Sequence, residues 1–188
     1  MRFLDSKQEW VLAALERARR KSAPVIISPP YSTRFHSLEL RGADIPNIRV
    51  RIAEGRITVT HPPTLLLTGE YVQKAIKKGI EEAWRIEAKG LLPHRTAEIA
   101  RTLGFRYNSV TIRNTVSKWG SCSARNDISL SVHLMRLPDH LIDYIIVHEL
   151  CHTIHKNHGP QFHALLDLHT AGRHPALRKQ LRAYNTRW

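Results

Sequence analysis

The feature that most constrains the fold is a group of three ionisable residues inside an almost uninterrupted apolar segment. His148, Glu149 and His152 lie within LIDYIIVHELCHTI at 141–154. A helix that is apolar on nearly every side is buried in its protein. Because burying two imidazoles and a carboxylate without partners is costly, the sequence requires a fold that surrounds this helix and gives those groups a partner.

The spacing of the three residues indicates that the partner is a metal ion. On a helix, His148 and His152 lie one turn apart on the same face, so both imidazoles can bind one ion. Glu149 lies about 100° around the helix from His148, where it can act as a general base on water without binding the ion. Histidines placed by chance on a solvent-facing helix fit poorly with the apolar flanks. We therefore expect a hydrolytic zinc site, although histidine-rich sites also accept nickel, cobalt or copper.

A catalytic zinc ion usually has three protein ligands, so a third ligand should follow this helix. The candidates along the chain are His155, His158, His163 and Asp167. We favour His158 because the sequence Asn-His-Gly-Pro at 157–160 is suited to turning the chain back. His155 would lie about 10 Å along the helix axis from His148, so we expect it beside a ligand or the substrate. The two later candidates are more simply explained as polar residues on the surface of the next helix.

The N-terminal part predicts one helix and a small antiparallel sheet. A capping box, S-K-Q-E, opens an amphipathic helix over about 6–21. The apolar run VIIS within 22–30 is expected to form a strand. Apolar and polar residues alternate over 33–40 and 48–60, and a turn around Gly55 makes the second segment a hairpin.

The middle of the chain predicts two helices and a second hairpin. Apolar positions at helical spacing indicate a helix over about 69–88, ended by the sequence GLLP, and a shorter one over 94–103. The alternating segments 110–118 and 128–134 flank the turn-rich loop WGSCSARND and are typical of a hairpin. A helix that starts near Pro138 then carries the metal motif, and two short helices finish the chain.

The length of 188 residues suits one domain. Within it we expect an N-terminal helix and β region over 1–68 and a metal-binding region over 69–188. Cys122 and Cys151 are expected to be free thiols. No apolar run is long enough to span a bilayer, and the first ten residues lack the apolar core of a signal peptide. We therefore expect a cytoplasmic protein without a membrane partner.

Further residues around the motif form a longer pattern: a W-G-S-C loop, a Leu-Pro, a tyrosine, then H-E-x-x-H and N-H-x-x-x-F. They are Trp119, Gly120, Ser121, Cys122, Pro138, Tyr144, His148, Glu149, His152, Asn157, His158 and Phe162. Over about 110–165, this combination resembles the YgjP-like metallopeptidase domain family of zincin-like metal-dependent hydrolases.

The resemblance implies a zincin-like α+β fold, in which a small antiparallel sheet and a hairpin pack against the helix that carries the motif. It also implies zinc at His148, His152 and His158, with Glu149 as the general base. The chain departs from the family pattern at His163, where tryptophan is common, and no methionine turn follows the motif.

Five residues are expected near the substrate or beside the ligands: Lys118, Trp119, Ser121, Tyr144 and His155. Tyr144 lies one helical turn before His148, on the same side. A tyrosine that only fills the core explains this position equally well.

A peptide is the foremost expected substrate, because the hairpin over 110–134 offers an edge strand to an extended chain. The alternative is a nucleoside triphosphate, cleaved to the monophosphate and pyrophosphate. The net charge of +13 favours polyanions, and Lys118, Arg125 and Arg136 are expected to face the motif. A third hypothesis, a nucleic-acid-binding module with a structural metal, leaves Glu149 without a role, and structural zinc sites usually have four ligands.

Overall fold

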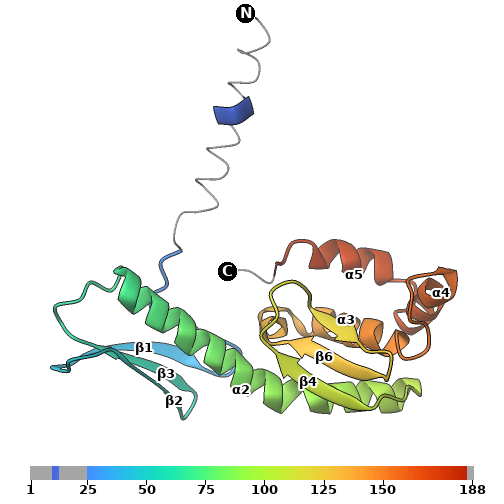
Figure 1. Cartoon of the computed structure of the whole chain (residues 1–188), viewed down its shortest axis with the longest axis horizontal. Coiled ribbons are helices and arrows are strands. Elements are labelled where there is room, and N and C mark those ends of the chain that lie inside the picture. Colours follow the sequence, from blue (N-terminus) through green and yellow to red (C-terminus); the bar gives the residue numbers. More distant parts are fainter. Residues whose placement is uncertain (1–9, 13–24, 186–188) are drawn as a thin grey trace, which may run out of the picture.

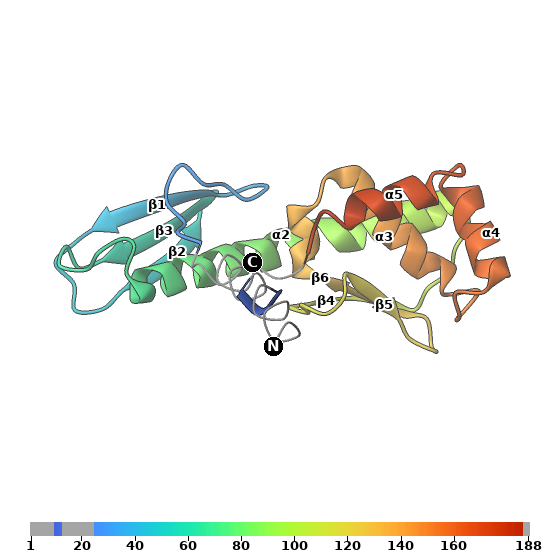
Figure 2. The ribbon, with the colours of Figure 1, turned by 90° about the horizontal axis from the view of Figure 1, so that it is seen from above.

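The computed structural model describes residues 10–12 and 25–185. The helix predicted over 6–21 lies outside these residues except at 10–12, which are helical. The remainder is a mixed α+β structure, as expected, built along one long helix, α2 (Glu70–Leu103), as Figure 1 shows. Two small sheets lie toward opposite ends of α2, which is clearest from above (Figure 2).

Helix α2 runs without interruption through Gly90 and Pro93, so the predicted division into two helices is wrong. A proline inside a helix removes a backbone hydrogen bond and costs roughly 3 kcal/mol. The buried face of α2 continues past the proline through Ile99 and Ala100, and its packing against both sheets offsets that cost. The predicted end at Gly104 is confirmed, since this residue has a φ of 76° and donates its N–H to the carbonyl of Ala100.

The first sheet consists of β1 (Ser37–Gly42), β2 (Arg49–Ala53) and β3 (Arg56–His61). The predicted hairpin around Gly55 is confirmed, because β2 and β3 pair antiparallel across it. The expectation of a purely antiparallel sheet is wrong, since β1 pairs parallel with β3. β3 buries Ile57 and Val59 completely, which places it at the centre of the order β1-β3-β2.

The apolar run VIIS is not a strand. The N–H of Ile27 donates to Oε1 of Gln73, at 2.8 Å, and Nε2 of Gln73 donates to the carbonyl of Ile27, at 2.9 Å. A side-chain amide on α2 therefore supplies the hydrogen bonds that a neighbouring strand would otherwise make.

The second sheet consists of β4 (Ser109–Arg113), β5 (Gly120–Cys122) and β6 (Asp127–Ser131). The hairpin predicted between 110–118 and 128–134 is wrong, because β4 pairs parallel with β6. It is the short strand β5 that pairs antiparallel with β6. Here too the most buried strand is central, with Ile128 and Leu130 at most 1% exposed, and β5 becomes an edge strand in the order β4-β6-β5.

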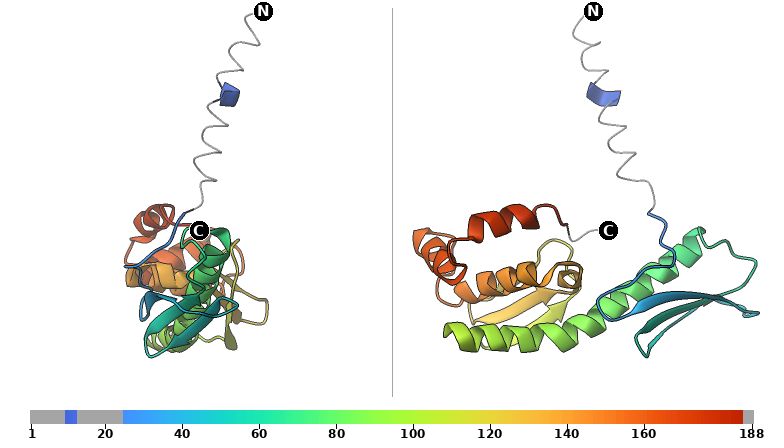
Figure 3. Two further views of the ribbon diagram at one scale, coloured as in Figure 1. Left: turned by 90° about the vertical axis from the view of Figure 1, so that its left-hand side faces the viewer. Right: turned by 180° about the vertical axis from the view of Figure 1, so that it is seen from behind.

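The C-terminal part contains a 3₁₀ helix, η1 (Val132–Arg136), and the helices α3 (Asp139–Cys151), α4 (Pro160–His169) and α5 (His174–Leu181). α3 lies between α2 and α5 (Figure 3) and is buried over most of its surface, as its sequence predicts. The two cysteines, Cys122 and Cys151, are free thiols, as expected. Within the described ranges, no helix is long and apolar enough to cross a membrane.

Candidate metal centre

The end of α3 and the turn after it bring three histidines together. His148 lies in the last turn of α3, and His152 is its C-terminal cap. The chain then reverses before α4, which returns His158 to the same place. Nε2 of His158 lies 3.0 Å from Nε2 of His148 and 3.2 Å from Nε2 of His152. In the part of the chain that the structure describes, no other three His, Cys, Asp or Glu side chains converge in this way.

His155, which was expected beside a ligand, determines which ring nitrogen of His152 carries the proton. Nδ1 of His152 lies 3.0 Å from the carbonyl oxygen of His155. Because a carbonyl can only accept a hydrogen bond, Nδ1 carries the proton and the lone pair of Nε2 is left for an ion. His155 therefore reaches the cluster through its backbone.

The chemistry of the cluster fits a divalent cation. Burial, followed by the neighbouring His152 and His158, lowers the pKa of His148 to about 3. Burial also lowers the pKa of His152. Nε2 of His158 lies about 3 Å from Nε2 of both His148 and His152, so the three nitrogens are placed to bind one cation together.

Phe162 packs against all three imidazoles. This residue of α4 is fully buried. Its ring centroid lies 4.9 Å from that of His148, 4.4 Å from that of His152 and 4.7 Å from that of His158. The phenylalanine was one residue of a longer sequence pattern, and nothing local in the sequence indicates this supporting role.

The side chain of Glu149 lies against β5, at Gly120. It is buried, and its Oε2 has no hydrogen-bond partner among the described residues. Burial raises the pKa of this carboxyl to about 7, against the opposing charge of Lys118. A Cβ added to Gly120 would lie 2.7 Å from Cγ and Oε1 of Glu149. Only a glycine therefore lets β5 approach the carboxylate this closely.

The remaining expected site residues lie around this core. Tyr144 is buried, with its ring centroid 6.3 Å from that of His148. Ser121 lies on β5, the edge strand that packs against α3, and Trp119 directly precedes this strand. Lys118 acts on Glu149 through its charge.

Several alternatives from the sequence lie outside the cluster. The ring of His163 is 6.4 Å from that of His158, and Asp167 accepts a hydrogen bond from His174 at 2.8 Å. Arg136 lies over the ring of Trp84 on α2. Arg125 lies beside Asp127. Neither Arg136 nor Arg125 lines the cavity that opens next to the cluster, described below.

That cavity has a volume of about 320 Å³ and opens beside His148 and His158. Its walls come from α3, α4, α5 and the turn between α3 and α4, and the lining residues are Tyr144, His148, His158, His163, Leu166, His174 and Arg178. His174 and Arg178 on α5 were not predicted from the sequence, because only the packing of α5 against α3 brings them here.

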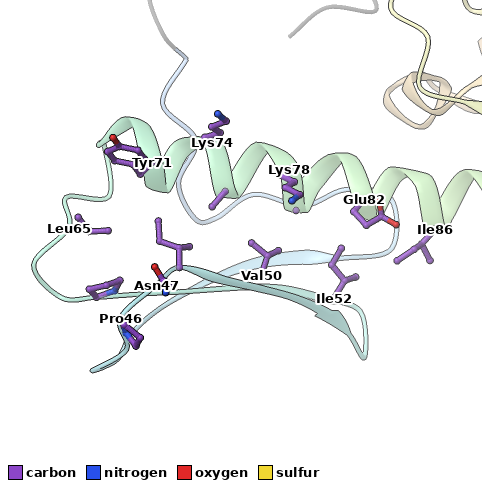
Figure 4. A pocket seen from close by; sticks show the side chains of 14 residues that line it. Pro46, Asn47, Val50, Ile52, Leu65, Tyr71, Lys74, Lys78, Glu82 and Ile86 are labelled. Carbon is purple, nitrogen blue, oxygen red and sulfur yellow. The ribbon is translucent and has the colours of Figure 1, made fainter.

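A larger groove, of about 940 Å³, lies between β2 and α2 (Figure 4). Apolar side chains such as Val50 and Ile52 face it from the strand, and Tyr71, Lys74 and Lys78 lie along it on the helix. It contains no histidine or cysteine. This groove is larger than the cavity at the histidine cluster. The side chains that could hold a metal ion nevertheless lie at the cluster.

The chain is similar to several known proteins and to one family. Two solved structures are similar, the metallopeptidase zymogens jannalysin of Methanocaldococcus jannaschii and abylysin of Pyrococcus abyssi. Their sequence identities are 23% and 19%, each match covers 48% of this chain and 92% or 90% of the other, and both TM-scores are 0.43. No curated protein matches the chain. The model of the YgjP-like metallopeptidase domain family matches residues 1–184. Since this match spans nearly the whole sequence, the chain belongs to the YgjP-like metallopeptidase domain family and is a metal-dependent hydrolase of the metallopeptidase type.

Proposed function

We propose that the chain is a zincin-like, zinc-dependent hydrolase of peptides, in which His148, His152 and His158 hold the metal and Glu149 is the general base. The observation that carries the proposal is the convergence of three Nε2 atoms, together with a buried glutamate next to His148 in the sequence whose Oε2 has no partner among the described residues. The chemistry that zinc supplies in such a site is Lewis acidity, which makes water a nucleophile near neutral pH.

The residues of the chain supply the rest of the reaction. Glu149 follows directly after His148 but does not belong to the group of converging side chains, so we assign its carboxylate a role other than holding the metal. It accepts the proton of the attacking water and passes it to the amine that leaves when the peptide bond breaks. Hydrogen-bond donors of the protein do not compete for Oε2 of Glu149, since none among the described residues reaches it.

The edge strand β5 supports a peptide as substrate. In the described part of the chain, no strand pairs with its outer edge. An extended peptide can add to such an edge through backbone hydrogen bonds. Gly120 at the start of β5 contacts the Glu149 side chain, so a peptide bound along this strand would pass close to the general base.

The direct test is Glu149→Gln, which keeps the shape of the side chain and removes its basicity. We expect peptide hydrolysis by the zinc-loaded protein to fall by about 10²–10⁴-fold, while the zinc content stays at the wild-type level. Glu82→Gln, an exposed position on α2, is the matched control. Hydrolysis that survives in Glu149→Gln but depends on zinc would refute the role of this residue.

A nucleoside triphosphate is a second candidate substrate, because Arg178 places a permanent positive charge in the cavity beside His148. Water would then break the bond between the α and β phosphates and release pyrophosphate. Zinc-dependent pyrophosphate release that disappears in Glu149→Gln, without any peptide hydrolysis, would favour this substrate over a peptide.

A further inference from the structure

We propose that the cavity between the histidine cluster and α5 is a subsite for a terminal anionic group of the substrate, a carboxylate or a phosphate, bound by Arg178. This inference rests on the proposed function, because it names the class of substrate that the proposed metal centre would act on. It concerns binding and can be tested without catalysis.

Helix α5 directs two polar residues into this cavity. His174 and Arg178 are four positions apart, so they lie on the same face of the helix. Both line the cavity together with His148 and His158. A substrate group held by α5 would therefore lie beside the proposed metal ligands, within a few bonds of the reacting atoms.

Arg178 is free to bind an external anion. In the described ranges, no carboxylate lies within ion-pair distance of its guanidinium, whereas six other arginines have such partners: Arg34, Arg41, Arg56, Arg85, Arg95 and Arg125. Asp167, the acidic residue nearest to α5 in the sequence, accepts a hydrogen bond from His174 at 2.8 Å. The positive charge of Arg178 is therefore not neutralised by any carboxylate among the described residues.

The charge of Arg178 acts on the inner end of the cavity. Burial raises the pKa of the Tyr144 hydroxyl, and Arg178 opposes that rise. Arg178 also contributes, after burial and three neighbouring histidines, to the low pKa of His148. Tyr144 lines the same cavity as Arg178, so its hydroxyl is a second candidate donor to the anion.

The chemistry and size of the cavity favour a terminal group. A guanidinium presents planar N–H donors that match the paired oxygens of a carboxylate or phosphate. A volume of about 320 Å³ is at the lower limit for small-molecule sites. It suits the end of a substrate, either the C-terminal residue of a peptide or one phosphate of a nucleotide, better than the interior of a long polymer.

The test compares binding of matched probes that differ only in the anionic group. The probes are N-acetylleucine against N-acetylleucinamide, and adenosine monophosphate against adenosine. Affinities are measured by calorimetry or NMR titration, on both metal-free and zinc-loaded protein, for the wild type, Arg178→Gln and Arg178→Lys. Lys179→Gln, which removes the same charge from the next, exposed position of α5, is the control.

We expect at least one anionic probe to bind the wild type about tenfold or more tightly than its neutral counterpart. This preference should disappear in Arg178→Gln, remain in part in Arg178→Lys and be unchanged in Lys179→Gln. A preference restricted to N-acetylleucine identifies the carboxylate of a peptide, one restricted to the nucleotide identifies a phosphate, and both support the subsite.

The proposal is overturned if the wild type shows no preference for either anion, or if Lys179→Gln loses as much as Arg178→Gln. Because binding is measured without turnover, active Glu149→Gln protein would refute the proposed base and leave this subsite in place. Conversely, loss of the anion preference would leave the metal centre unaffected.

Discussion

The two sheets of this protein have the same topology but different neighbours. In each, the last strand in sequence is central, pairs parallel with the first strand and antiparallel with the second. Both pack against α2 (Figure 1). The edge strand β2 borders an open groove, whereas the edge strand β5 lies against α3. The metal-binding histidines therefore lie at the second sheet, because the element beside its edge strand is α3, the helix that carries His148 and Glu149.

Each sheet approaches its neighbour through one glycine. At the first sheet the glycine is Gly79 of α2. A Cβ added to it would lie 2.8 Å from Ile57 and 3.0 Å from Val50. At the second sheet the glycine is Gly120 of β5, which contacts Glu149. The first contact is between apolar groups and stabilises the fold. The second contact positions a carboxylate, so substitutions at the two glycines should have different consequences.

The largest expected effect on stability is that of Phe162→Ala. Removing a fully buried phenylalanine costs about 3–5 kcal/mol, and the three imidazoles lose the ring that supports them. Chemical denaturation should show this loss, and a chelator competition should show weaker zinc binding. The exposed Leu168→Ala on the same helix should change neither. Wild-type zinc affinity in folded Phe162→Ala would show that the ring has no role in placing the ligands.

Gly120→Ala should reduce activity as well as stability. The whole side chain of Glu149 must shift to avoid the new methyl group, which meets Cγ as well as Oε1, so we expect the free energy of unfolding to fall by about 1–3 kcal/mol while the protein stays folded. A displacement of about 1 Å in a catalytic group can lower turnover by about 10²-fold. Turnover and denaturation curves measured on the same preparation separate the two quantities. Unchanged turnover would mean that β5 does not position Glu149.

Gly79→Ala should reduce stability without reducing activity. Overpacking costs about 1–3 kcal/mol, and the better helix propensity of alanine offsets about 1 kcal/mol of this. We expect a net loss of about 1 kcal/mol in the free energy of unfolding, with unchanged kcat and KM. Gly90→Ala, where no atom lies within 4 Å of the added Cβ, is the control and should stabilise α2. A fall in turnover at Gly79→Ala would couple the two ends of the molecule.

The smallest effect is expected from Lys74→Gln combined with Lys78→Gln in the groove of Figure 4. Surface substitutions of this kind usually change stability by less than about 0.5 kcal/mol. Turnover of a short peptide should remain at the wild-type level, because the groove lies at the other sheet. A rise in KM would show that the groove takes part in substrate binding.

The sequence predicted those features that depend on residues close together in the chain. Helix α3, its burial and the grouping of His148 with His152 follow from spacing, and the return of His158 follows from the turn-forming residues beside it. The pairing of the strands was predicted wrongly because it depends on which strands are buried by distant elements. The predicted break of α2 at Pro93 was wrong for a similar reason. The packing that offsets the cost of this proline comes from strands that are distant in the sequence.

Residues that act through tertiary contact left no local signal. The close approach at Gly120 exists because β5 meets α3, and Arg178 reaches the cavity because α5 folds back over that helix. A basic residue on a terminal helix is otherwise indistinguishable from the other basic residues of a chain with a net charge of +13.

The central claim, that His148, His152 and His158 hold the catalytic metal, is tested most directly by zinc affinity. We predict one zinc ion per wild-type chain and an affinity at least about 10²-fold weaker in His158→Ala, since even the loss of residues that only support metal ligands costs 10–100-fold. His94→Ala, an exposed histidine on α2, should bind zinc like the wild type. Wild-type stoichiometry and affinity in His158→Ala would contradict the account and move the third ligand to another residue.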